Sequence, residues 1–207
     1  MVSTHASKVR WFVLALAILV VSAGTVRAND LILVGTGGVS IPTGEVGEDL
    51  IGPGVVFGGM LYVGLTNQVY VSGGGHLSVF GEGEIGGTAV TDVGVSFTFD
   101  GGFLFYLVDR LQSQFQPYVA ATAGFGVLAW DYTPAGQLAF GVSSDSNNFF
   151  YFAPEAGIAL GLNELIDFRA GFRFLVTIYG DNTNEGFGWD LGGGHYAEIY
   201  AGMGFSL

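Results

Sequence analysis

One short pattern in the sequence has residue types that could support nucleophilic catalysis. His76 and Ser78 lie two positions apart, and this spacing places an imidazole and a hydroxyl on the same face of an extended strand. A working site also needs an acid that orients the histidine, and such a triad is recognised by a geometry that one spacing does not define. The spacing arises often by chance, so catalysis at this pair is the less favoured interpretation.

Acidic residues gather in several Gly- and Asn-rich segments that contain no Lys or Arg. Carboxylate oxygens are preferred ligands of Ca²⁺ and Mg²⁺, so these segments could bind divalent cations. Segment 181–186 is similar to a calcium loop, but Gly192 stands where the bidentate glutamate would be, which argues against a dedicated site. An equally favoured interpretation is that the acids keep polar loops solvated. The candidate cation-binding residues are Glu45, Glu48, Asp49, Asp181, Glu185 and Asp190.

The charge balance narrows the classes of function further. Acidic residues outnumber basic ones by 18 to 6, and only Arg110, Arg169 and Arg173 remain beyond residue 28. Such an acidic chain is a poor partner for nucleic acid. It contains no Cys, which excludes disulfides and thiolate metal sites, and no fingerprint of a nucleotide site is present. We therefore expect no cofactor and no nucleic-acid partner.

The first 28 residues have the organisation of a secretory signal peptide. Lys8 and Arg10 form a positive start, an apolar run covers 11–23, and Val26 and Ala28 offer small residues for cleavage. The apolar run is well short of the ~20 residues that span a bilayer as a helix. The sequence therefore predicts a cleaved signal over 1–28 and a single domain over 29–207.

The elements that would position the candidate residues are predicted by alternation along the chain. From Val93 to Tyr106, Val and Phe alternate with Gly, Ser, Thr and Asp, and a similar alternation ends the chain from His195 to Leu207. About eight such segments are separated in turn by short turns and long polar loops: 31–41, 55–65, 69–80, 93–106, 118–130, 149–162, 168–179 and 195–207. This pattern predicts an all-β fold, an eight-stranded antiparallel up-and-down transmembrane β-barrel whose last strand pairs with the first.

The number of phenylalanines indicates which face of the strands lies inside. An eight-stranded barrel has an interior just wide enough for side chains to fill, and the phenylalanines would overfill it. We therefore expect Phe, Val, Ile and Leu to face lipid, with Gly, Ser, Thr, Tyr and a few charges in the lumen. Aromatic residues near strand ends could form interfacial girdles or fill the lumen, and the sequence leaves both open.

The same assignment places several ionisable side chains in the lumen. Counting outward from a turn at Asn163 sets Glu155 opposite Arg173, which predicts a buried ion pair. The favoured interpretation is a structural plug, because buried charges are normally paired, and the alternative is a gate or a proton path. The predicted lumen residues are Asp100, Glu155, Arg169, Arg173, Glu198 and His76.

The chain resembles the small eight-stranded outer-membrane proteins of the OmpA/OmpX/OmpW-like class over nearly all of 29–207. The likeness rests on the closing strand 195–207, where Leu207 replaces the usual final Phe, and on the segments 39–44, 116–118 and 123–126. The resemblance implies export through the periplasm and residence in the outer membrane of a Gram-negative bacterium. It also implies contact with outer-membrane lipid and lipopolysaccharide, and insertion by the barrel assembly machinery.

Three functions are compatible with this resemblance. The favoured one is a non-enzymatic barrel with acidic extracellular loops and a largely filled polar lumen, in an envelope-structural or surface-interaction role. The alternative is a narrow cation-preferring channel. The third is a lipid A-modifying enzyme, because His76 and Ser78 resemble the His-x-Ser of outer-membrane lipid A deacylases. The Asn-Ala-Gly pattern that follows in those enzymes is missing here, and we expect no acid on the right neighbouring strand.

Overall fold

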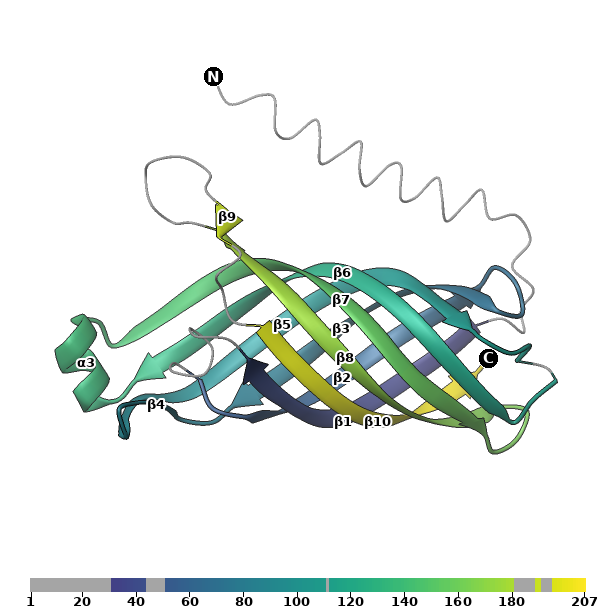
Figure 1. Cartoon of the computed structure of the whole chain (residues 1–207), viewed down its shortest axis with the longest axis horizontal. Coiled ribbons are helices and arrows are strands. Elements are labelled where there is room, and N and C mark those ends of the chain that lie inside the picture. Colours follow the sequence, from purple (N-terminus) through teal and green to yellow (C-terminus); the bar gives the residue numbers. More distant parts are fainter. Residues whose placement is uncertain (1–30, 44–50, 111, 181–188, 191–194) are drawn as a thin grey trace, which may run out of the picture.

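The computed structural model describes residues 31–43, 51–110, 112–180, 189–190 and 195–207, with the backbone alone at 179–180 and 189–190. The predicted signal, 1–28, lies outside these residues. Eight long antiparallel strands of the described chain form a closed barrel (Figure 1). They are β1 (Leu31–Thr43), β2 (Gly54–Gly64), β3 (Val69–Phe80), β5 (Thr88–Tyr106), β6 (Phe115–Tyr132), β7 (Ser144–Gly161), β8 (Ile166–Gly180) and β10 (His195–Ser206). The sheet closes because β10 pairs with both β1 and β8, so the predicted up-and-down barrel is confirmed.

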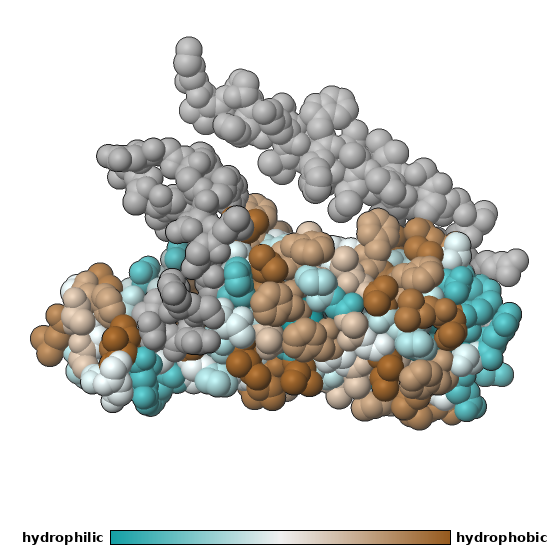
Figure 2. All heavy atoms as spheres, in the orientation of Figure 1, coloured by the Kyte–Doolittle hydropathy of each residue, from teal (hydrophilic) through white to brown (hydrophobic). Residues whose placement is uncertain are grey.

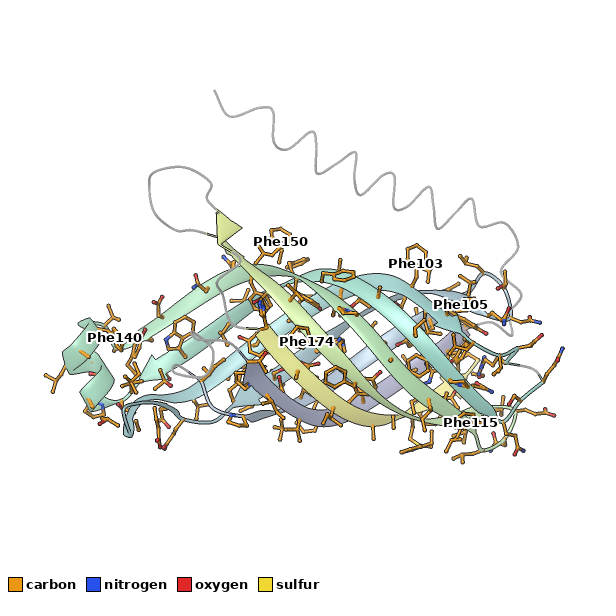
Figure 3. The ribbon with its side chains drawn as sticks, in the orientation of Figure 1. Phe103, Phe105, Phe115, Phe140, Phe150 and Phe174 are labelled. Carbon is orange, nitrogen blue, oxygen red and sulfur yellow. The ribbon has the colours of Figure 1, made fainter. Side chains whose placement is uncertain are left out.

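The two faces of the wall have opposite character, as the alternation predicts. On β5, Phe97, Phe99 and Phe103 are 54%, 57% and 55% exposed, while the intervening Thr98 and Leu104 are buried. Hydrophobic side chains cover much of the outer wall (Figure 2), and Phe103 and Phe150 point away from the barrel (Figure 3). These phenylalanines therefore face outward, and the closed ladder pairs the backbone groups that a bilayer would leave without water.

Glycine on the inner face makes room for the large side chains of the lumen. A Cβ on Gly58 would lie 2.2 Å from Nδ1 of His76, whereas a Cβ on the outward Gly59 would meet nothing within 4 Å. A real Cβ cannot approach another atom as closely as the first distance. Position 58 must therefore be glycine to leave room for His76, whereas packing places no such requirement on position 59.

Two consecutive residue pairs are missing from one ladder of the wall. The β7–β8 ladder stops at Phe152 and Val176 and resumes at Glu155 and Arg173 in the same register. Pro154 lies in this gap, and proline has no N–H to donate to a ladder. The interruption is thus local, and it lies directly beside the polar groups described below.

Three strands are longer than a membrane requires. β5, β6 and β7 have 19, 18 and 18 residues, against about 9–11 in a transmembrane strand. Beyond them, the short strand β4 (Gly83–Ile85) forms a hairpin with β5, and the helix α3 (Pro134–Phe140) connects β6 to β7. The sequence predicts only loops over 81–91 and 131–148, so these extensions are a correction. A further short strand, β9 (Trp189–Asp190), extends the ladder of β8.

The connections differ in length at the two ends, as predicted. At the end near the C-terminus the turns are tight; Leu65 and Leu162, for example, donate backbone hydrogen bonds of 2.8 and 2.9 Å to Val69 and Ile166. At the other end lie β4 and α3 (Figure 1). We call these ends the turn end and the loop end. No helix in the described ranges is long and apolar enough to cross a membrane.

Candidate functional site

Arg173 is the centre of a buried polar network in the lumen. It lies on β8, where its register partner across the closing pair with β10 is Glu198. Its Nε and Nη2 donate to Oε2 of Glu198 at 2.9 and 2.5 Å, and its Nη1 donates to Oδ2 of Asp100 at 3.3 Å. Nη1 also lies 2.9 Å from Nε2 of His76, which fits a neutral ring that accepts at Nε2. One guanidinium therefore joins strands β3, β5, β8 and β10.

Asp100 receives further donors from β6 and β7, the next two strands of the wall beside β5. The hydroxyl of Tyr151 on β7 donates to its Oδ2 at 2.7 Å, and Thr122 on β6 contributes a longer contact of 3.5 Å. The Asp100 side chain has no exposed surface. A buried carboxylate is costly unless it is paired and hydrogen-bonded. Oδ2 of Asp100 meets both conditions, while the buried Oδ1 has no hydrogen-bond partner among the described residues.

Glu155 is paired differently from the prediction. It is the register partner of Arg173, as the count from Asn163 indicates. The predicted ion pair between the two is wrong, however: Glu155 accepts a hydrogen bond from the hydroxyl of Tyr200, which lies 2.7 Å from the hydroxyl of Tyr118. Arg173 instead forms ion pairs with Asp100 and Glu198. Two carboxylates reached from one guanidinium offer more Coulomb attraction than the single carboxylate across the rung.

A second arginine layer lies nearer the turn end. Arg169 is 1% exposed, and its Nε and Nη2 donate to Asp167 at 2.7 and 3.2 Å. Its Nη2 also donates to the hydroxyl of Tyr106 at 2.8 Å, and its guanidinium lies 5.0 Å from the ring centre of Tyr62. Arg110, in the turn after β5, reaches Asp167 at 3.5 Å and closes this layer toward the outside.

Sequence reasoning missed Asp167 and Arg110 as lumen residues. Asp167 is two residues before Arg169, so strand alternation alone puts the two side chains on one face. That signal was available. Arg110 lies in a turn, where alternation gives no direction, and only the folded chain shows that it lies over the Tyr70 ring, 6.0 Å from its centre.

Hydrophobic side chains close the lumen on both sides of the ionic groups. The expected lumen of Gly, Ser, Thr, Tyr and charges is therefore incomplete. The cluster at the loop end contains Ile51, Phe80, Leu128, Trp130, Tyr132, Phe149, Tyr151, Ala153, Leu175 and Tyr196. The cluster at the turn end contains Ile32, Val34, Met60, Tyr62, Tyr70, Leu104, Tyr106, Tyr118 and Ala159. Many aromatic residues near strand ends thus fill the lumen instead of forming a girdle.

A small cavity remains between the two arginine layers. It has a volume of about 20 Å³, and its lining combines apolar side chains such as Val34 and Met60 with polar ones that include Glu155, Arg169 and Arg173. A cavity needs roughly 10–15 Å³ on this measure to hold one water. The space therefore suits about one water and is no continuous path through the barrel.

Several solved structures share this architecture. No protein-family model and no curated protein matches the sequence. The structure of Neisserial surface protein A superposes with a TM-score of 0.58 at 13% identity, covering 86% of this chain and 97% of that one. OprG of Pseudomonas aeruginosa gives 0.58 at 14% identity, covering 87% and 97%. Ail, the attachment invasion locus protein of Yersinia pestis, gives 0.52 at 15% identity, covering 86% and 99%.

The chain has the fold of the small eight-stranded outer-membrane β-barrels. Identities this low establish the fold and nothing finer.

In this outer-membrane barrel fold, the His76–Ser78 pair lies inside the lumen. Both residues are buried, and Nε2 of His76 is hydrogen-bonded to Arg173. The expectation that no acid lies nearby is wrong, because Oδ2 of Asp100 on the adjacent strand is 3.5 Å from Nε2 of His76. A triad needs the acid and the serine on different ring nitrogens, yet Nδ1 faces Gly58. The arrangement is that of a structural histidine.

The structure does not test the predicted cation-binding residues of the loops. Glu45, Glu48, Asp49, Asp181 and Glu185 lie outside the described residues, as does the side chain of Asp190 in β9. Among the described side chains, no group of three or more His, Asp or Glu is placed to hold a metal ion. Binding of divalent cations by the loops stays a prediction.

Proposed function

We propose that this protein is a non-enzymatic integral protein of the outer membrane of a Gram-negative bacterium, with an envelope-structural or surface-interaction role. The observation that carries the proposal is the plugged lumen inside an apolar wall. Arg173, with its carboxylate and histidine partners, fills the cross-section between two hydrophobic clusters, and the remaining cavity is about 20 Å³. Because the wall faces lipid and the interior is filled, only the two ends of the barrel are free to contact other molecules.

The two ends of the barrel suggest its orientation. Tight turns at one end and long connections at the other are the layout of outer-membrane barrels, in which the long loops face the outside. We propose that the loop end, with α3 and β4, is extracellular, that lipid and lipopolysaccharide surround the phenylalanine-rich wall, and that the barrel assembly machinery inserts the chain from the periplasm. The name of Ail refers to attachment and invasion, and that protein has been crystallised with the heparin analogue sucrose octasulfate. These properties belong to Ail, and they motivate the surface-interaction part of the proposal.

A narrow cation-preferring channel is the second candidate. Four lumen carboxylates, Asp100, Glu155, Asp167 and Glu198, outnumber the three arginines of the described chain. This excess of negative charge would favour cations over anions if the plug opened. The filled cross-section argues against conduction in the closed barrel.

The location and the conductance are tested separately. A barrel in the outer membrane should fractionate with that membrane, and its gel migration should change between unheated and boiled samples. Purified protein in planar bilayers should give no steady single-channel openings. Recovery of the processed chain in the periplasmic extract would contradict the membrane assignment. Steady cation-selective openings would contradict the structural role and support the channel.

The enzyme alternative has its own test. Overexpression should leave the number of acyl chains on lipid A unchanged, because His76 and Ser78 face the lumen and not the lipid. Loss of an acyl chain that Ser78→Ala abolishes would restore the lipid A-modifying enzyme.

A further inference from the structure

We propose that the loop end carries a docking surface for a cationic amphipathic segment of another polypeptide. The surface consists of the exposed hydrophobic residues Leu138, Phe140 and Val142, which we call the apolar tip. The inference deepens the proposed surface-interaction role, on which it rests for the extracellular orientation of this end.

The apolar tip is held in place by specific contacts. Thr133 caps the helix: its hydroxyl accepts from the N–H of Gly136 at 3.2 Å and donates to the carbonyl of Ala89 at 2.7 Å. Gly136 packs so closely on β5 that a Cβ would lie 2.0 Å from the carbonyl oxygen of Val90. The C-terminal cap, Gly141, has a φ of 75° that favours glycine. The helix is therefore a fixed part of the barrel's end.

These contacts leave the hydrophobic side chains outside. Leu138 is 90% exposed, Phe140 45% and Val142 46%. Gly136 is the one buried residue of α3, whereas a short helix on a protein surface normally buries its apolar side. Figure 3 shows Phe140 on α3 at the far end of the barrel, and Figure 2 shows hydrophobic surface there, beyond the apolar wall. Because α3 follows the exposed Asp131 at the end of β6, these side chains lie past the apolar wall.

The charges around the tip select the partner. Segment 133–143 has no ionisable residue. The described acids of the loop end are all exposed, namely Glu82, Glu84, Asp92, Asp131 and Asp145. The described arginines lie elsewhere: Arg110 in a turn at the opposite end, and Arg169 and Arg173 inside the lumen.

An apolar tip at an end that carries exposed carboxylates and no described arginine is complementary to an apolar face flanked by Lys or Arg. A second copy of this chain would bring a second set of carboxylates to the same place, and an anionic membrane surface would be repelled in the same way. The charge distribution thus favours a cationic peptide segment over both.

The test uses the full mature chain in nanodiscs of phosphatidylcholine, with empty nanodiscs as the background. The probe is a fluorescently labelled helical peptide of Leu and Lys, compared with a matched peptide of Leu and Glu and with a lysine homopolymer. Anisotropy should show saturable binding of the Leu/Lys peptide alone, weakened by salt as exposed charges are screened. Leu138→Ser should weaken binding about tenfold, as expected for loss of a leucine side chain from a contact.

The matched control is Leu165→Ser, which removes a leucine that is 63% exposed at the turn end, and it should leave binding unchanged. The double substitution Glu82→Gln with Glu84→Gln should weaken binding and reduce its salt dependence. Unchanged binding by Leu138→Ser would overturn the proposal, as would equal binding of the Leu/Glu peptide. Concentration-dependent dimerisation through the tip, or binding of phosphatidylglycerol vesicles in place of the peptide, would assign the surface to those occupants instead.

Failure of this proposal is distinguishable from failure of the proposed function. Peptide binding is measured on purified protein and does not depend on where the chain resides in the cell. A barrel that fractionates with the outer membrane but ignores the peptide would retain its location and lose this partner.

Discussion

Replacing Arg173 by methionine tests the ionic plug most directly. The Arg173 side chain is 4% exposed, and its guanidinium contacts Glu198, Asp100 and His76. Methionine keeps the length of the aliphatic stem and removes the charge, so the two carboxylates lose their cation while packing changes little. The perturbation is therefore electrostatic, and it falls on groups that solvent does not reach.

The expected loss follows from the burial of the partners. Removing one member of a buried ion pair typically costs about 3–5 kcal/mol, because the other charge remains without compensation. We expect Arg173→Met to lower the free energy of unfolding by that amount near neutral pH. Arg110→Met is the matched control. Arg110 is 13% exposed, and its partner Asp167 keeps Arg169 at 2.7 Å, so the cost should not exceed about 2 kcal/mol.

Equilibrium unfolding from lipid vesicles in urea, followed by Trp fluorescence, measures these free energies. The fraction of heat-modifiable protein on a gel provides a second probe of the folded state. Adding Glu198→Gln to Arg173→Met should destabilise by about 1–3 kcal/mol less than the sum of the two single changes, because the residues contact each other. An Arg173→Met cost no larger than that of Arg110→Met, or strict additivity with Glu198→Gln, would refute the ionic plug.

Three further predictions use the same unfolding assay. Pro154→Val should stabilise the barrel by about 1 kcal/mol, because it restores a donor to the interrupted β7–β8 ladder; a loss of stability would show that the gap has another cause. Gly58→Ala should cost about 1–3 kcal/mol through collision with the lumen histidine, while Gly59→Ala should be neutral; equal effects would contradict the assignment of faces. Phe99→Lys should cost about 2–4 kcal/mol in the bilayer, whereas Leu138→Lys at the loop end should change stability little.

The sequence predicts the ends of a strand best where turn residues mark them. Segment 69–80 alternates less clearly than 93–106, yet it matches β3 at both ends, because a polar turn precedes it and a Gly- and Glu-rich segment follows it. The start of β7 is predicted five residues late because Ser144 to Asn148 are polar on both faces. Such residues give no periodic signal when both faces of a strand meet water, as they do beyond a membrane. Helix α3 is not predicted for a related reason. Its apolar residues do not face a core, so they show no helical periodicity.

The polar network is only partly readable from sequence. Alternation assigns His76, Asp100 and Arg173 to the inner face, and the tight turn at Asn163 fixes the register of Glu155 against Arg173. The register of Glu198 against Arg173 cannot be obtained by counting from a turn, because a long connection joins β8 to β10. Which carboxylate a long arginine side chain selects also depends on contacts across the lumen. Those contacts exist only once the barrel has closed.

The ionic groups also bear on how the chain distinguishes its two faces. A slip of one residue in the pairing of β8 would turn Arg169 and Arg173 toward lipid and Phe172 into the lumen. An arginine on the lipid face costs about 2–4 kcal/mol near the middle of the bilayer. In the lumen, Phe172 would also collide with Tyr200, because the Tyr200 ring fills the space beside Gly171. A purely hydrophobic lumen would lack the first penalty. We infer that the buried charges specify which face turns inward, in addition to filling the interior.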